Sequence, residues 1–140
     1  MRNFNYMKTL SYGIFLLIIL LSLQSLNGAT ITSTGSGGDW ATGGTWVGGV
    51  APSSTDDVNI AAGATVTVAA DATCASLTLP STVSGTSTVI INSGITLTVT
   101  GAVTLPNTFF SGLNTITVGS GILLAGSIDF IYAQGTSSRH

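Results

Sequence analysis

The feature that most constrains the fold of this chain is a short alternating pattern that recurs along it. After residue 30, aliphatic residues alternate mostly with threonine in short runs, which Gly, Ser, Asn or Pro separate. A period of two is typical of half-buried strands, and this region lacks the 3.6-residue period of a helix. The sequence therefore predicts an all-β fold. The clearest runs span residues 58–60, 65–68, 77–79, 89–91, 96–99, 103–105 and 115–118.

These runs are related to one another. Residues 58–68 align with residues 89–99 as an aliphatic strand, a two-residue spacer, a glycine, one residue and then Thr-aliphatic-Thr-Val, and residues 116–124 form a weaker third copy. A strand-Gly-strand unit that recurs about every 30 residues predicts a β-solenoid, in which each coil buries its apolar face against the next. A β-sandwich with irregular hairpins is the alternative. The corner glycines of the three copies are Gly63, Gly94 and Gly121.

The segment before these strands has a different composition. Residues 30–52 are rich in Gly and Ser and contain both tryptophans, Trp40 and Trp46. The open end of a solenoid exposes apolar side chains and unpaired strand groups, so it needs a cap. We expect residues 30–52 to form this N-terminal cap, with the two indoles folded over the first coil. Residues 53–133 are then the solenoid coils, and residues 134–140 are a polar tail.

The first 29 residues have the three parts of an export signal. Arg2 and Lys8 make the start positive, an apolar stretch is unbroken from residue 14 to residue 21, and small residues follow at Gly28 and Ala29. This order predicts a signal-peptide helix cleaved near Gly28 or Ala29, and therefore a secreted or cell-surface protein that meets the membrane only through this segment. A retained membrane anchor is the alternative, because the uncharged stretch approaches the length of a bilayer-spanning helix.

Cleavage of this leader would leave a mildly acidic chain with very few charges. Five Asp would then face Arg139 alone, with no Lys and no Glu. Nucleic-acid-binding proteins draw most of their affinity from Lys and Arg contacts to phosphates, so the sequence predicts no nucleic-acid partner. The only cysteine, Cys74, cannot form an internal disulfide, so the core and the β ladders must stabilise the fold.

Groups that could carry out catalysis are sparse. Asp56 and Asp57 are sequence neighbours, so on a strand they point to opposite faces and cannot form the opposed carboxylate pair of a glycosidase. The only histidine is His140, the last residue, and Cys74 has no basic neighbour to lower its pKa. We therefore expect a protein that is not an enzyme, without catalytic residues or cofactors.

One hypothesis for a ligand site concerns calcium. Asp56 and Asp57 could bind Ca²⁺ together with backbone carbonyls and Asp39. The competing interpretation is turn chemistry, because the preceding Ser and Thr side chains are typical of a turn that leads into a strand.

A second hypothesis concerns threonine. If the coils stack in register, the Thr-x-Thr pairs would form a flat, uncharged strip that could bind ice or a carbohydrate surface. The competing interpretation is that Thr simply suits the solvent face of a strand. The strip would consist of Thr65, Thr67, Thr96, Thr98, Thr115 and Thr117.

The residues around Trp46 carry a resemblance to a known group of proteins. In order they are Trp46, Gly48-Gly49, Pro52, Asp56-Asp57-Val58, Ile60, Gly63, Val66, Val68 and Leu77-Thr78-Leu79. This order resembles the glycine-rich domain that opens many bacterial secreted β-helix proteins and some animal extracellular ones, and it is similar to the first coils of large bacterial surface adhesins. The resemblance covers residues 45–99. It implies a right-handed parallel β-helix at the start of a larger secreted or surface-anchored protein, whose C-terminal coils this chain lacks.

Together these observations predict a non-catalytic, exported β-solenoid. It would act as a structural stalk or adhesive segment of a bacterial surface protein, with a carbohydrate or another cell surface as its partner. Two alternatives stay open. One is the N-terminal part of a polysaccharide-degrading β-helix enzyme, and the other is an ice- or glycan-binding solenoid that uses its threonines.

Overall fold

A computed structural model describes residues 28–80, 85–107 and 114–132 of the chain. Residues 1–27, which hold most of the expected signal peptide, and residues 134–140, the expected polar tail, lie outside these ranges. The described residues form ten β-strands and one short 3₁₀ helix, η1 (Gly43–Thr45). Within these ranges no helix combines the length and the apolar character that crossing a membrane requires.

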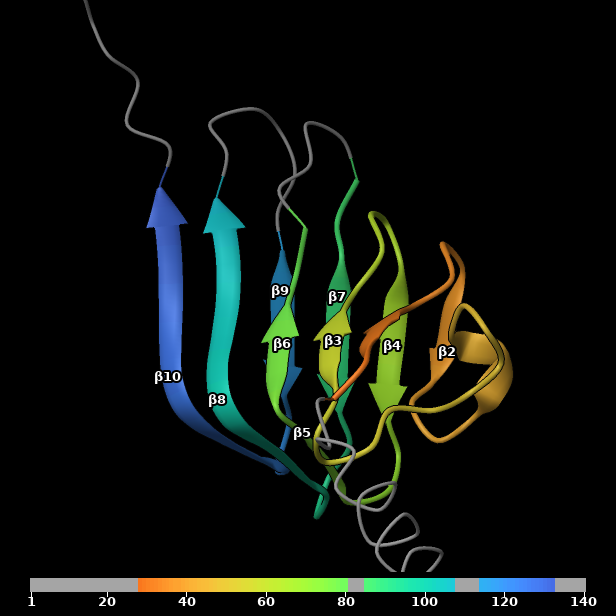
Figure 1. Cartoon of the computed structure of the whole chain (residues 1–140). Helices are drawn as coiled ribbons and strands as arrows, with labels where there is room; N and C mark the ends of the chain where they lie inside the picture. Colours follow the sequence, from red (N-terminus) through yellow and green to blue (C-terminus); the bar gives the residue numbers. More distant parts are fainter. Residues whose placement is uncertain (1–27, 81–84, 108–113, 133–140) are drawn as a thin grey trace, which may run out of the picture.

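The strands form two sheets that face each other (Figure 1). The first sheet contains, in order, β1 (Thr30–Thr32), β3 (Asp57–Asn59), β6 (Ser76–Thr78), β8 (Thr96–Asn107) and β10 (Ile122–Tyr132), and β5 (Ala72–Cys74) also pairs with β8. The second sheet contains, in order, β2 (Gly37–Asp39), β4 (Thr65–Val68), β7 (Thr88–Ile91) and β9 (Thr115–Val118). All of these strand pairs are parallel.

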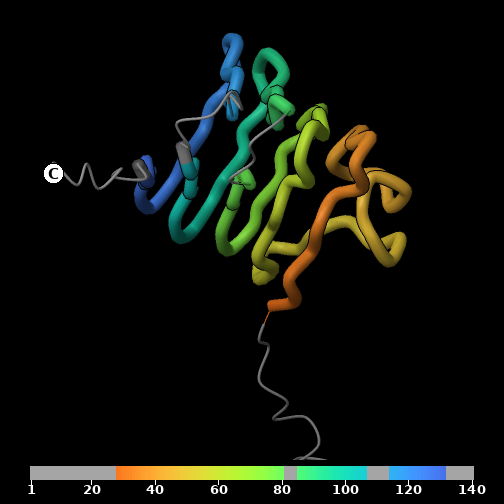
Figure 2. The backbone as a smooth tube through the Cα atoms, turned by 90° about the horizontal axis from the view of Figure 1, so that it is seen from above, coloured from red at the N-terminus to blue at the C-terminus, as the bar shows by residue number. Residues whose placement is uncertain are grey.

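The chain winds between the two sheets and stacks each coil on the one before. Figure 2 shows the coils side by side, with the N-terminal coil at one end of the stack and β10 at the other. The result is a parallel β-solenoid of about four turns, which confirms the predicted fold class. The β-sandwich alternative is wrong, because sandwich sheets are antiparallel and the described strand pairs are parallel.

The alternating pattern produces the core, because every second residue of a strand points inward. Val58, Leu77 and Val103 occupy equivalent positions in successive coils, and all three side chains are fully buried. Val66 and Val89 likewise occupy equivalent positions in the second sheet, and both side chains are fully buried. Burying such aliphatic side chains contributes roughly 1.5–3 kcal/mol each, so the stacked apolar rows are the main source of stability.

The stacking differs from the predicted alignment of the repeats. Thr65 pairs with Thr88, not with Thr96 as the alignment of residues 58–68 with residues 89–99 implies. The reason is that β8 bends, so that β5 pairs with its first part and β6 with its second, and the coils after the first each have three sides. Gly63 forms the corner between β3 and β4, whereas Gly94 forms the corner between β7 and β8. Similar sequences therefore serve two different corners.

The expected N-terminal cap is partly a coil of the solenoid. Within residues 30–52, β1 stacks in register on β3 and β2 stacks on β4, so only the segment after Asp39 leaves the stack. Trp40 and Trp46 are buried and meet edge to face, with ring centroids 5.1 Å apart, and both belong to the apolar core. The indole nitrogen of Trp46 donates a hydrogen bond of 2.8 Å to the carbonyl oxygen of Trp40. The two indoles thus close the first coil.

Candidate functional site

The outer face of the second sheet carries threonines in register. Thr65, Thr88 and Thr115 lie directly above one another on β4, β7 and β9. Their inward neighbours along the strands, such as Val66 and Val89, are fully buried, so the threonines face outward. Adjacent strands lie about 4.8 Å apart, so this row presents a hydroxyl and a methyl group at that spacing. A second row beside it contains Thr67, Ile90 and Thr117.

The structure divides the six threonines of the predicted strip between two sheets. Four of them lie on the second sheet as expected, but Thr96 and Thr98 belong to β8 in the first sheet. Thr88 takes their place in the row, and the repeat pattern did not predict it because that pattern aligns Thr65 with Thr96. The signal that could have found Thr88 is the similarity of residues 65–68 to residues 88–91. The four threonines that share the sheet are Thr65, Thr67, Thr115 and Thr117.

The first sheet has a polar outer row as well. Thr32, Asn59, Thr78 and Thr104 follow one another in register on β1, β3, β6 and β8. A shallow groove runs beside this row. It is lined by Thr32, Asn59, Ile60, Ala61, Thr78 and Pro80. Both broad faces of the solenoid therefore present hydroxyl or amide groups that donate and accept hydrogen bonds, and on the first sheet Asp129 of β10 follows Thr104 in the same row.

Asp56 is engaged in a turn. One carboxylate oxygen accepts hydrogen bonds of 2.7 Å from the backbone N–H and the hydroxyl of Ser53, and the other accepts one of 2.7 Å from the N–H of Ala29. Asp57 accepts a bond from the Ser76 hydroxyl, and Asp39 accepts one of 2.9 Å from the N–H of Ala41. Among the described residues, no three His, Cys, Asp or Glu side chains come together as metal ligands. The arrangement of these residues therefore gives no geometric support to the calcium hypothesis.

The turn at Asp56 leads to a prediction about pH. The bonds from Ser53, its backbone N–H first and its hydroxyl second, and then from Ala29 hold the pKa of the Asp56 carboxyl below its usual range. A carboxyl whose pKa is lowered by folding stabilises the fold above its unfolded pKa of about 3.9, and this contribution disappears as the pH falls through the lower folded value.

We expect Asp56→Asn to lower the free energy of unfolding at pH 7 by about 1 kcal/mol or less, since the hydrogen bonds of Asp56 are exposed to solvent. The difference from the wild type should disappear as the pH falls through the lowered pKa of the Asp56 carboxyl. Urea unfolding at several pH values measures it. Asp129→Asn is the control, because Asp129 accepts no hydrogen bond from the described residues, and an equal pH effect there would contradict the assignment.

Cys74 is a small core residue. Its side chain is fully buried at the end of β5, next to the apolar residues of the first sheet. Burial, with a smaller contribution from the negative charge of Asp57, raises the pKa of the Cys74 thiol to about 12. The thiol is the inert form of cysteine, so this side chain packs in the core, in line with its lack of a basic neighbour in the sequence.

A prediction about reactivity follows from this burial. In the folded protein at pH 8, we expect Cys74 to react with a thiol reagent at least about 100-fold more slowly than in 6 M guanidinium chloride, because it is both enclosed and protonated. The rate of colour release from an aromatic disulfide measures this. Fast labelling of the folded chain would show that β5 opens readily.

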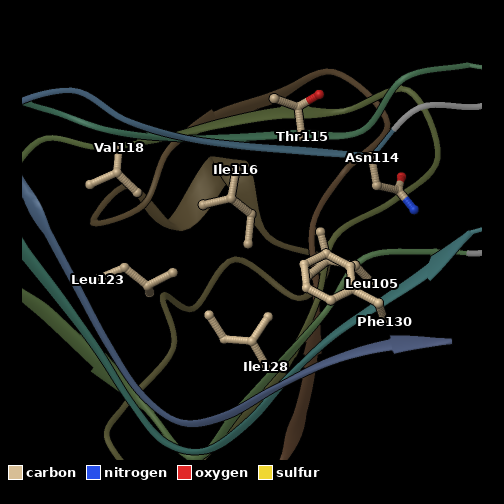
Figure 3. Close-up of a pocket in the computed structure, with 8 residues that line it drawn as sticks. All are labelled: Leu105, Asn114, Thr115, Ile116, Val118, Leu123, Ile128 and Phe130. Carbon is tan, nitrogen blue, oxygen red and sulfur yellow. The ribbon is translucent and has the colours of Figure 1, made fainter.

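The C-terminal end of the stack holds an apolar groove. Figure 3 shows that side chains from β9 and β10 point toward one another across it, among them Ile116, Leu123 and Ile128. Phe130 lies at its rim and is 60% exposed, and Asn114 closes one side. The groove is therefore the interior of the last described coil, on which no further described strand stacks. Its lining consists of Leu105, Asn114, Thr115, Ile116, Val118, Leu123, Ile128 and Phe130.

These surfaces define what the described part of the molecule can do chemically. Its broad faces offer hydroxyl, amide and methyl groups, and its C-terminal end offers apolar side chains. Hydroxyl and amide rows suit uncharged polar partners, whereas the end suits an apolar one. The chain matches no protein-family model, no curated protein sequence and no solved structure. The inference about its function therefore rests on the geometry of the described residues.

Proposed function

We propose that this protein is a non-catalytic, exported β-solenoid module that acts as a stalk or adhesive segment at a bacterial cell surface. The observation that carries the proposal is the Thr65-Thr88-Thr115 row on a flat, parallel sheet. A solenoid adds length with each coil while it presents the same outer face, which suits both a spacer and a repetitive binding surface. The partner of this face is a carbohydrate, because its hydroxyl groups can exchange hydrogen bonds with those of sugars.

The junction between the leader and the solenoid supports the export part of the proposal. Gly28 lies so close to the next coil that an added Cβ would stand 1.5 Å from the carbonyl oxygen of Thr55. The N–H of Ala29 is bonded to Asp56 at 2.7 Å. Cleavage after Gly28 would turn this nitrogen into an α-ammonium group at the same carboxylate, which adds an ion pair to the existing hydrogen bond.

Export is tested by producing the full chain with a C-terminal tag in a Gram-negative bacterium. We expect the tagged protein outside the cytoplasm, with a mass that corresponds to a chain beginning at Ala29. Replacement of Leu17 and Ile18 by lysines, which interrupts the apolar stretch of the leader, should leave the precursor uncleaved in the cytoplasm. Cytoplasmic protein that retains Met1 in the unaltered chain would contradict the proposal.

Adhesion is tested with the exported protein on a glycan array. Thr88→Lys places a long, charged side chain in the middle of the outer row, so it should reduce binding at least tenfold. Thr78→Lys is the matched control, since Thr78 lies at an equally partly buried outward position on the first sheet. Equal losses in both variants would contradict the assignment of binding to the second sheet, and an absence of glycan binding by the wild type would leave only the stalk role.

The same row favours one other candidate function, which is binding to ice. Regularly spaced threonines at about 4.8 Å present methyl and hydroxyl groups in a repeating order. Ile90 interrupts the second row between Thr67 and Thr117, so the regular array is one residue wide. Thermal hysteresis of the exported protein at millimolar concentration tests this function, and ordinary ice growth would exclude it.

A further inference from the structure

The backbone at the start of the first coil is held on both sides of one residue. The N–H of Ala29 donates a hydrogen bond of 2.7 Å to Oδ1 of Asp56, and the carbonyl oxygen of Ala29 accepts one of 2.9 Å from the N–H of Asp57. β1 begins at the next residue, Thr30, which pairs with Asp57. The nitrogen of Ala29 therefore has a fixed position in the wall of the solenoid, against the carboxylate of Asp56.

The other bonds of Asp56 orient its carboxylate toward this nitrogen. Its second oxygen, Oδ2, accepts hydrogen bonds of 2.7 Å from the backbone N–H and from the hydroxyl of Ser53. Oδ1 accepts only the bond from Ala29 among the described residues, so it has capacity for a stronger donor. The bonds from Ser53 and then from Ala29 hold the pKa of Asp56 below its usual range, so the carboxyl is ionised at neutral pH.

This carboxylate lacks a positively charged partner in the described part of the chain. Residues 28–132 contain no Lys, Arg or His. A hydrogen bond between two ionised groups is roughly twice as strong as a neutral one, so a cation at the Ala29 nitrogen would strengthen the contact. Hydrolysis of the Gly28–Ala29 bond would create such a cation. It consumes one water, leaves a carboxylate on Gly28 and gives Ala29 an amine that is mostly protonated at neutral pH.

Gly28 lies against a second acceptor. It is bonded directly to the Ala29 nitrogen, and a Cβ added to it would stand 1.5 Å from the carbonyl oxygen of Thr55. No backbone N–H of the described residues is bonded to that oxygen. Removal of Gly28 with the leader would therefore free the Thr55 oxygen beside the new α-ammonium group, which has two more N–H groups than the amide it replaces.

We propose that the Asp56 carboxylate and the Thr55 carbonyl oxygen form a binding site for the amino terminus of the mature chain, so that leader cleavage completes the first coil. This inference rests on the export proposed above and gives the cleavage a structural consequence. One N–H of the α-ammonium group donates to Oδ1 of Asp56, and the others serve the Thr55 oxygen and water. An ion pair then ties the start of β1 to the segment before β3.

The pair has a defined pH range. The groups that face the amine are the Asp56 carboxylate and the Thr55 carbonyl oxygen, with Asp57 as the next charge along the chain, and all of them favour its protonated form. An amine whose pKa is raised by folding stabilises the fold below its unfolded pKa of about 7.7–8.0, and this contribution is lost as the pH rises through the higher folded value. At low pH the pair is lost when Asp56 becomes protonated.

The chain offers a selective readout of this site. It contains no lysine after Lys8, so the amino terminus is the only amine of a chain that begins at Ala29. Only the unprotonated amine attacks an activated ester. The rate of acylation, followed by mass spectrometry of the intact exported protein between about pH 6 and pH 10, therefore gives the pKa of this amine. The C-terminal tag must lack lysine, and the same mass identifies the first residue.

We expect the midpoint of the acylation profile to lie about 0.5 pH unit higher in the wild type than in Asp56→Asn. Asp71→Asn is the matched control, because Asp71 also accepts a backbone N–H, that of Thr96 at 2.8 Å, but it is not bonded to Ala29. It should keep the wild-type midpoint, and circular dichroism should show the same strand content in all three proteins. Equal midpoints in the wild type and Asp56→Asn, or an equal decrease in Asp71→Asn, would overturn the inference.

A second measurement removes the charge without a substitution. Acetylation of the amino terminus should lower the urea midpoint of the exported wild type at pH 7, because it converts the ion pair back to a neutral hydrogen bond. The same treatment of Asp56→Asn should leave its urea midpoint unchanged, since the two changes act on one interaction. Acetylation that leaves the wild type equally stable would count against the site.

Failure of export and failure of this inference give different results. Tagged protein that retains Met1 would overturn the export proposal and the inference with it. Protein that begins at Ala29 but has the same acylation midpoint as Asp56→Asn would overturn the inference alone. Protein that begins at another residue would place its amine away from Asp56, so it would contradict the inference while export stands.

Discussion

Replacing Trp46 by alanine is expected to lower the free energy of unfolding by about 3–5 kcal/mol, a large part of the total stability of a domain of this size. Trp46 is 2% exposed and packs edge to face on Trp40, so its removal opens a cavity at the first coil. It also removes the indole N–H that donates a hydrogen bond of 2.8 Å to the carbonyl oxygen of Trp40. Denaturant unfolding followed by circular dichroism measures the change.

Two further variants separate the causes of this loss. Trp46→Phe keeps much of the apolar volume but lacks the indole N–H, so it should cost less than the alanine variant. Val47→Ala changes the next residue, whose side chain is 64% exposed, and should cost less than about 0.5 kcal/mol. A Trp46→Ala protein as stable as the Val47→Ala protein would show that the indoles do not close the first coil.

Replacing Gly37 by alanine is expected to have a comparable effect, of about 2–5 kcal/mol, for a different reason. Gly37 has a φ of +67°, and an added Cβ would stand 2.0 Å from the carbonyl oxygen of Thr65. The atom it meets is backbone of the next coil, which cannot move without breaking the pairing of β2 with β4. The first coil would therefore separate from the stack.

Other glycines serve as matched controls for this variant. Gly63 has a similar φ of +75° but open space around an added Cβ, so Gly63→Ala isolates the cost of the left-handed backbone, about 1–2 kcal/mol. Gly35 has neither a positive φ nor a close neighbour, so Gly35→Ala should be neutral within about 0.5 kcal/mol. Equal losses of stability for Gly37→Ala and Gly63→Ala would mean that the backbone adjusts, so that the contact of the added Cβ with the carbonyl oxygen of Thr65 costs nothing further.

Local sequence was sufficient to predict which residues form the core. A strand has a side-chain period of two, so Val66 and Val68 had to share a face, whichever strand lay next to them. Both are fully buried. The burial of the two tryptophans also followed from composition, since an open apolar end of a solenoid needs large side chains to cover it.

The candidate binding face could be predicted only in part. Thr65 and Thr67 were expected to face outward, and they do, but their neighbour in the next coil is Thr88 and not Thr96. The Thr-x-Thr-Val pattern occurs on two different sides of the coil, and pattern alone does not distinguish them. The length of the segment between two stacked strands decides the pairing, and these segments vary from coil to coil.

The recurring strand-Gly-strand unit thus determined by itself that the described region after residue 30 is all β, that its strands bury one face, and that the coils stack. These properties depend on contacts within one strand or between neighbours, which the period of two encodes directly. Tertiary structure alone decided which threonines share a row, that β1 and β2 belong to the first coil, and that apolar side chains of β10 such as Ile128 and Phe130 are exposed. Such properties depend on the register between segments far apart in the chain, and a one-strand shift in that register leaves the local pattern unchanged.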